Sequence, residues 1–186
     1  LGAVENFFSK CAPAMFMGWS NLNFDRRMFH FNFFKGNRYP YATHASPNSE
    51  HDGLHIARAA QTLNSETLKT ELTEAGNPSL ALESLSRMQG FDTSASHTAY
   101  VDAENSLNVL RIIKNKHKEN WEIFLKTSTK TSVETLLKND GIYSIFENVK
   151  GRNMMYLTCT LHPKYSFHPR YTSWGYLWDL RRDPEP

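Results

Sequence analysis

The sequence predicts an α+β protein in which a mainly antiparallel sheet is covered by a helical middle region. Strand-like runs occur near both ends of the chain, and residues from about 49 to 138 show the periodicity of helices. A length of 186 residues fits one compact domain with a substantial core. We therefore expect a single domain over residues 1–186, in which residues 1–23 stay ambiguous between helix and loop.

The first predicted strand is the aromatic-rich stretch at residues 24–41. Phe29, Phe31 and Phe33 alternate along it, as residues on one face of a strand do. Pro40 is expected to end the strand, because proline lacks the backbone N–H that a sheet requires. A strand this apolar needs a cover, and the helices that follow it in sequence are suited to that role.

Capping residues and breaks in the apolar pattern divide the middle region into five predicted helices. They span about residues 49–63, 65–75, 78–89, 104–125 and 131–138. Gly76 and Gly90 follow the second and third helices, as glycine often does at a helix C-terminus. Pro78 is expected at the first position of the third helix, where its missing N–H costs nothing.

The longest predicted helix carries a regular apolar face. Its members are spaced three or four residues apart and are Leu107, Leu110, Ile113, His117, Trp121 and Phe124. We expect this face to belong to the core. The opposite face is basic, and a solvated surface is sufficient to explain it.

The final third of the chain changes to strand-like patterning. Residues 142–149 and 154–161 are predicted to pair as a hairpin through a turn at 150–153. Residues 171–180 are predicted as a third strand, and residues 181–186 as a frayed tail. Together with the N-terminal strand, these strands would form the predicted sheet.

Composition excludes several classes of protein. With 40% hydrophobic and 22% charged residues the chain is not disordered, and a net charge of +2 restricts any anion-binding surface to a local patch. No apolar run approaches the roughly 18 residues that span a bilayer.

The chain has only two cysteines, Cys11 and Cys159, and no Asn-X-Ser/Thr signal. These features favour an intracellular protein, while the start at Leu1 leaves a secreted mature form open.

Aromatic residues interleaved with lysine and arginine predict a surface that binds single-stranded nucleic acid or another anionic partner. Bases stack on exposed rings while the cations neutralise phosphates. The residues expected to bind are Lys35, Arg38, Tyr41, Lys164, Tyr165, Arg170 and Trp174. One shared site requires residues 38–44 and 162–174 to lie side by side. The alternative is that the rings are core, the commoner fate of strand phenylalanines.

A metal-dependent hydrolase is an alternative function. His51 and His55 are four residues apart, so on a helix they would share a face and could bind one divalent metal ion. His44 lies in the preceding loop and is the third candidate ligand. The competing interpretation is a pair of exposed histidines in the first turn of a helix.

A thiol hydrolase is the other enzymatic alternative. Cys11 could head a helix, which would activate its thiol, and His97 or His162 could act as the base. The competing interpretation is that Cys11 is a small buried hydrophobe. No P-loop, dinucleotide fingerprint, zinc-finger spacing, His-Glu-X-X-His or Gly-X-Ser-X-Gly motif is present to decide between an interaction module and a hydrolase.

Overall fold

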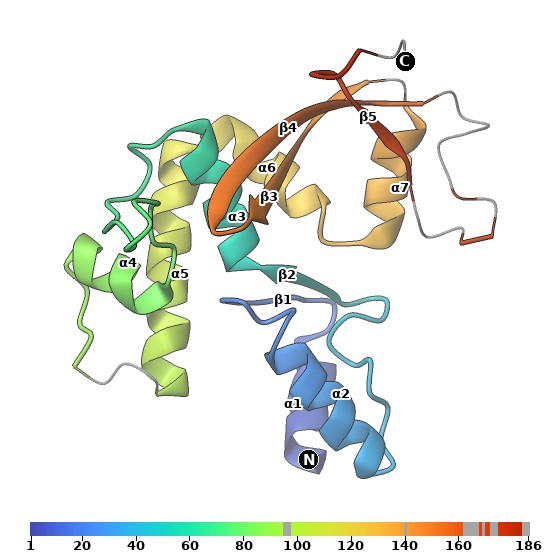
Figure 1. Ribbon diagram of the computed structural model, residues 1–186. Helices are drawn as coiled ribbons and strands as arrows, with labels where there is room; N and C mark the ends of the chain where they lie inside the picture. The colour runs from blue at the N-terminus through green and yellow to red at the C-terminus, as the bar shows by residue number, and fades with distance from the viewer. Residues whose placement is uncertain (95–97, 140, 162–167, 169, 172–174, 184–186) are drawn as a thin grey trace. The chain divides into compact units, whose positions relative to one another are not determined.

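The computed structural model describes residues 1–94, 98–139, 141–161, 168, 170–171 and 175–183. Contacts divide the chain into two compact units, Leu1–Thr129 (unit 1) and Lys130–Pro186 (unit 2), and each is described by itself. Helices together with antiparallel strands confirm the predicted α+β class (Figure 1). Within the described ranges, no helix combines the length and apolarity needed to cross a membrane. That the chain folds as one domain stays a prediction.

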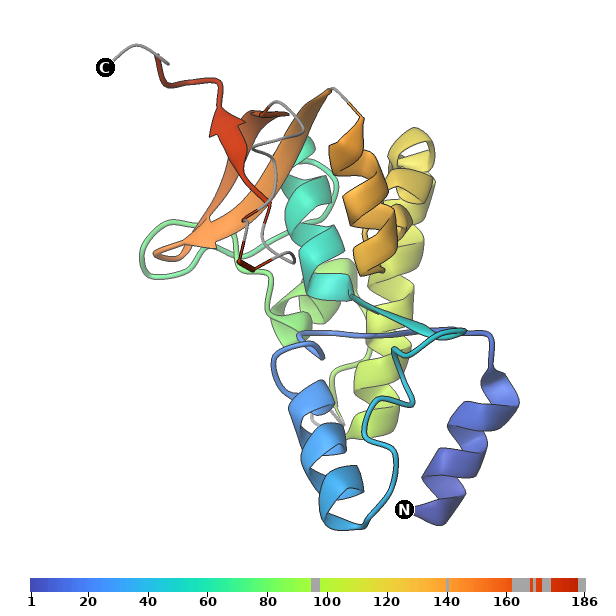
Figure 2. The ribbon, with the colours of Figure 1, turned by 90° about the vertical axis from the view of Figure 1, so that its right-hand side faces the viewer.

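Unit 1 consists of helices around a short pair of strands. The helices are α1 (Gly2–Cys11), α2 (Asp25–Lys35), α3 (Gly53–Leu63), α4 (Leu82–Gln89), α5 (Ala99–Lys116) and α6 (Lys118–Lys126), and the strands are β1 (Met15–Gly18) and β2 (Ser49–Asp52). β1 and β2 pair in parallel, with Met15 opposite Ser49 and Gly18 opposite Asp52. α1 and α2 lie on one side of this strand pair (Figures 1 and 2).

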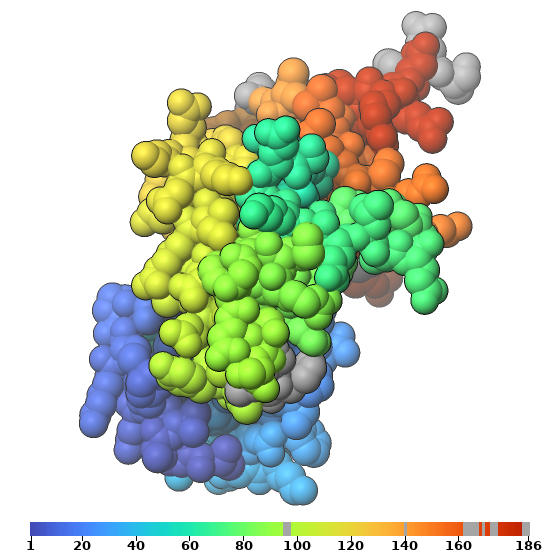
Figure 3. Space-filling model, turned by 90° about the vertical axis from the view of Figure 1, so that its left-hand side faces the viewer, coloured from blue at the N-terminus to red at the C-terminus, as the bar shows by residue number. Residues whose placement is uncertain are grey.

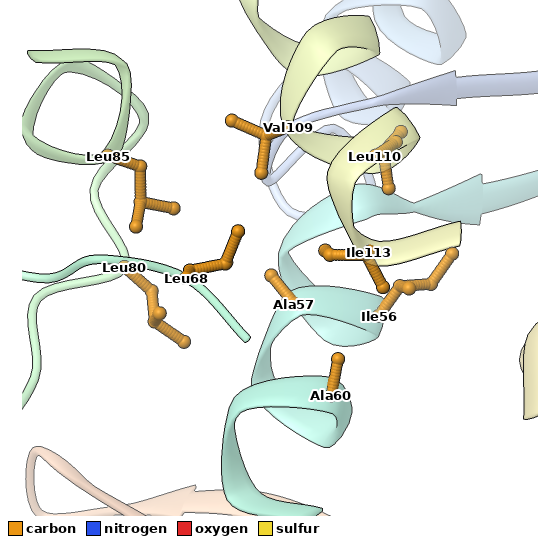
Figure 4. Packing of buried hydrophobic residues seen from close by; sticks show 9 residues of the cluster. All are labelled: Ile56, Ala57, Ala60, Leu68, Leu80, Leu85, Val109, Leu110 and Ile113. Atoms are coloured by element: carbon orange, nitrogen blue, oxygen red, sulfur yellow. The ribbon is translucent and has the colours of Figure 1, made fainter. Parts of the chain in front are cut away.

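The core of unit 1 lies between α3, α5 and α4 with the segment that precedes it. It is formed by Ile56, Ala57, Ala60, Leu68, Leu80, Leu85, Val109, Leu110 and Ile113 (Figure 4). α4, drawn in green, lies against α5 without a gap in the space-filling view (Figure 3). The predicted core face of the long helix is confirmed at Leu110 and Ile113 but is wrong at Leu107, which is 48% exposed.

The aromatic stretch is the helix α2, and the prediction of a strand there is wrong. Phe29 and Phe33, four residues apart, pack on Phe8 of α1, with ring centroids 5.5 and 6.3 Å from that of Phe8. Asp25 in the first turn and Lys35 in the last turn complement the helix dipole. A run this rich in phenylalanine fits both the alternation of a strand and the spacing of a helix. The contacts with α1 favour the helix.

Two helices begin later than predicted. α3 starts at Gly53, because residues 49–52 form β2, and Asp52 caps it by accepting a hydrogen bond from the Leu54 N–H at 3.0 Å. α4 starts at Leu82, four residues after Pro78. Its end is as predicted, at a glycine, Gly90, with a φ of 80°.

Residues 65–75 are not helical, contrary to the prediction. The Gln61 side chain accepts from the Leu68 N–H at 2.9 Å and donates to the Ser65 carbonyl oxygen at 2.7 Å. Because these bonds satisfy backbone groups that a helix would use, the segment keeps an irregular path.

The predicted helix at 104–125 is interrupted at His117, which separates α5 from α6. The Thr67 hydroxyl donates to the Asn64 carbonyl oxygen at 2.7 Å. It therefore accepts from His117 Nε2, which lies 2.6 Å from it. This buried bond fixes the turn between the two helices.

Unit 2 consists of α7 (Lys130–Lys138) and a sheet of β3 (Ile142–Val149), β4 (Arg152–Thr160) and β5 (Leu177–Asp179). The order is β3-β4-β5 and both pairings are antiparallel, which confirms the predicted hairpin. Its turn uses positive φ angles at Lys150 and Gly151, as tight hairpins require. The expectation of one sheet from both ends is wrong for the described strands, because α2 replaces the N-terminal strand and β1 pairs only with β2.

Candidate nucleic-acid interface

α2 buries one side and exposes the other. Phe33 is 2% exposed, whereas Phe24, Phe31 and Phe34 are 67%, 62% and 77% exposed. Most of the exposed side chains recur at helical spacing, and we call this set the α2 aromatic face: Phe24 (the N-cap), Arg27, Met28, Phe31, Phe34 and Lys35. Asp25 and Asn32 of α2 are exposed as well. Lys35 Nζ lies 5.8 Å from the centre of the Phe31 ring, so a cation and an exposed ring occupy the same surface.

A second aromatic group borders this face. The Tyr41 ring lies edge-on to His30, His44 and Tyr39, at centroid distances of 5.2, 5.5 and 5.6 Å. His30 belongs to α2 and is four residues from Phe34, so the two are neighbours on the helix surface. Tyr39 and Tyr41 are about half exposed and therefore present ring surface to solvent.

Buried Glu50 on β2 anchors the loop that carries these tyrosines. Its carboxylate accepts hydrogen bonds from Arg26 Nε of α2 and from the Thr43 hydroxyl of the loop. His44 Nδ1 lies 3.8 Å from Glu50 Oε1. Burial lowers the pKa of His44, and the nearby Glu50 carboxylate opposes that shift. Residues 36–48 run back from the end of α2 to β2 beside the helix (Figure 2).

Three of the predicted binding residues lie in this region of unit 1. Lys35 belongs to the α2 aromatic face, and Tyr41 borders it. Arg38 forms an ion pair with Glu5 of α1 and is still partly exposed. These three residues lie near the C-terminal end of α2, because Lys35 is its last residue and Arg38 and Tyr41 follow it closely in sequence.

The remaining predicted binding residues belong to unit 2. Arg170 is exposed, and its N–H and that of Tyr171 both donate to His168 Nδ1, at 3.1 and 2.9 Å. Lys164, Tyr165 and Trp174 lie outside the described residues. The expectation that residues 38–44 and 162–174 form one surface stays a prediction.

The described structure does not assemble the predicted metal site. His51 lies on β2 and His55 on α3, so their four-residue spacing does not place them on one helix face. His51 Nε2 donates to the Phe124 carbonyl oxygen at 2.7 Å, and its Nδ1 accepts from the Asp52 N–H at 2.8 Å. His44 instead belongs to the Tyr41 group. Across the described ranges, no three His, Cys, Asp or Glu residues are grouped so that they could hold a metal ion.

The structure does not place Cys11 at a helix N-terminus, as the thiol hypothesis required. Cys11 is the last residue of α1 rather than its first, and it is exposed, not buried. Both candidate bases, His97 and His162, lie outside the described residues.

Sequence reasoning missed the exposed phenylalanines and the Glu50 anchor. The sequence does contain a signal for the exposed phenylalanines. Spacings of four, three and four residues, typical of one side of a helix, separate Phe24, Met28, Phe31 and Lys35. The anchor has no comparable local signal, since Glu50 and Arg26 are 24 residues apart in sequence.

No protein-family model matches the sequence. Exodeoxyribonuclease I of Haemophilus influenzae is 25% identical over 169 residues, which cover 90% of this chain and 36% of the relative. Exodeoxyribonuclease I of Escherichia coli K12 is 30% identical over 105 residues, which cover 54% of this chain and 21% of the relative. The chain spans about a third of the length of the first two curated relatives that it matches.

Solved structures agree with the sequence matches. Exonuclease I from Methylocaldum szegediense gives a TM-score of 0.79 at 19% identity, covering 100% of this chain and 39% of that one. E. coli Exonuclease I in complex with a dA16 oligonucleotide gives a TM-score of 0.72 at 19% identity, covering 88% of this chain and 36% of that one. The chain is therefore similar in sequence, and alike in fold, to about a third of exonuclease I.

Proposed function

We propose that this chain binds single-stranded DNA on the α2 aromatic face and on the adjoining rings of Tyr39 and Tyr41. The observation that most supports this is the high exposure of Phe24, Phe31 and Phe34 on one side of a helix that also carries cations. Exposed apolar patches of this kind mark interaction surfaces. The likeness to an exonuclease I solved with dA16 supports the same class of ligand.

The two kinds of side chain contribute separately to binding. An exposed ring stacks on any base, for about 1–3 kcal/mol per base, and this contribution is nearly independent of salt. A lysine that neutralises a phosphate releases a counterion, so its contribution falls as salt concentration rises. Since the net charge is only +2, steep salt dependence would have to come from a local cluster of cations.

The proposal predicts distinct effects for Phe31→Ala and Lys35→Gln. Phe31→Ala should weaken binding of a fluorescent thymidine oligomer by about five- to a hundredfold and leave the salt slope unchanged, because only stacking is lost. Lys35→Gln should flatten the slope of log affinity against log salt by about 0.7, the value for one phosphate of a single strand. Fluorescence anisotropy over a series of salt concentrations measures both quantities.

Leu72→Ala and Lys118→Gln are the matched controls, because both positions are exposed and lie in other parts of unit 1. Both controls should bind as the wild type does. Equal affinity of Phe31→Ala and wild type would show that the α2 aromatic face is not the binding surface.

Shortening of DNA from an end is the second candidate function, which the exodeoxyribonuclease relatives favour. The described residues include no group of three or more His, Cys, Asp or Glu side chains that could hold a metal ion, and we derive no catalytic step for this chain. Incubation of an end-labelled oligonucleotide with the chain and Mg²⁺ tests this function. We expect binding without shortening, and shortened products that disappear with a chelator would establish the second candidate instead.

A further inference from the structure

His30 of α2 and His44 of the following loop form a close pair of imidazoles. Their ring centroids are 5.1 Å apart, and the Tyr41 ring contacts both. His30 Nε2 and His44 Nδ1 are both buried, and neither has a hydrogen-bond partner within the described structure. Two buried nitrogens without a hydrogen bond at one site, one of them 3.8 Å from Glu50 Oε1, point to a ligand that the site can accept, and the smallest such ligand is a proton.

The charges around the pair determine when it can take up that proton. His44 faces the Glu50 carboxylate from β2, the Arg26 guanidinium and His30 from α2, and Tyr41 from its own loop. Burial lowers the pKa of His44, Arg26 and His30 lower it further, and Glu50 opposes them. Glu50 is already engaged by Arg26 and Thr43, so it does not fully compensate a second cation.

Because burial lowers the pKa of His44, these surroundings favour a neutral His44 ring until another negative charge approaches. Two charged rings this close would repel each other, so the pair is suited to hold one proton rather than two. A phosphate over Tyr41 would supply the missing negative charge and raise the proton affinity of the pair. By linkage, the proton would strengthen phosphate binding by the same factor.

We propose that His30 and His44 take up one proton when single-stranded DNA binds beside Tyr41, so that binding strengthens as the pH falls. The inference rests on the proposed function, because it concerns the same surface. The feature is built from residues of α2, β2 and the connecting loop, and it makes the surface sensitive to pH in the range where imidazole titrates.

The affinity of the wild-type chain for a thymidine oligomer, measured by anisotropy at constant salt, should rise about tenfold between about pH 8 and about pH 6. His44→Asn and His30→Gln keep a polar group near the nitrogen concerned but cannot be protonated, so each should remove most of this rise. His55→Gln replaces an exposed histidine on α3 and should bind with the full pH dependence.

The outcomes separate this inference from the proposed function. Wild-type binding that does not vary with pH, or that varies equally in all three variants, overturns the proton-binding pair and leaves DNA binding intact. Absence of binding at every pH overturns both.

Proton NMR of the imidazole rings in the wild-type chain provides a test that does not depend on the variants folding. The oligomer should raise the titration midpoint of His44. An unchanged midpoint with bound DNA would overturn the inference.

Discussion

Buried histidines serve as neutral hydrogen-bonding groups in unit 1. His51 connects β2 to the C-terminal end of α6, and His117 fixes the turn between α5 and α6 through Thr67. In both residues burial lowers the pKa, because the protein interior disfavours the imidazolium. A neutral imidazole can donate from one nitrogen and accept at the other, and His51 does both.

This arrangement predicts a loss of stability in mild acid. The folded-state pKa of His51 is below its ordinary value of 6.5, so the unfolded chain binds more protons in that range. The free energy of unfolding should therefore fall as the pH falls below about 6.5. Urea denaturation at neutral and mildly acidic pH measures the change. His51→Gln can still donate to the Phe124 carbonyl oxygen and should lose less stability on acidification; an equal loss would assign the acid sensitivity to other groups.

At the scale of elements, the sequence was informative where local contacts determine the structure. The hairpin of β3 and β4, the short helix α7 and the buried positions of α5 follow from turn residues, capping residues and helical spacing. α2 was mistaken for a strand because its phenylalanines fit both the strand period and the helix period. Packing on Phe8, which is distant in sequence, favours the helix. The loop with Tyr41 could not be placed from sequence, since it depends on Glu50.

The two sides of α5 predict different costs of truncation. Ile113 is 0% exposed and packs against α3, so Ile113→Ala should lower the free energy of unfolding by about 2–5 kcal/mol through lost burial and a cavity. Leu107, on the same helix, is 48% exposed, and Leu107→Ala should change stability by less than about 0.5 kcal/mol. Chemical denaturation measures both variants. Similar losses in the two would contradict the assignment of the buried side.

At the scale of the whole molecule, burial is distributed unevenly. Every buried hydrophobic side chain in the described ranges belongs to unit 1, whereas Thr158 is the one buried side chain among the described residues of unit 2. The strands of unit 2 instead keep exposed apolar residues such as Ile142 and Leu157. Hydrophobic burial is the main favourable contribution to folding, so the two units should differ in stability.

We therefore predict that unit 2 opens at a lower free energy than unit 1 in the intact chain. Hydrogen exchange followed by mass spectrometry, over a series of low urea concentrations, reports the opening free energy of each peptide. Amides of β3 and β4 should exchange through an opening that leaves those of α3 and α5 protected, because the latter surround the core of Ile56, Val109 and Ile113. If all four elements exchange with the same free energy and the same urea dependence, the chain unfolds as the single domain that its length predicts.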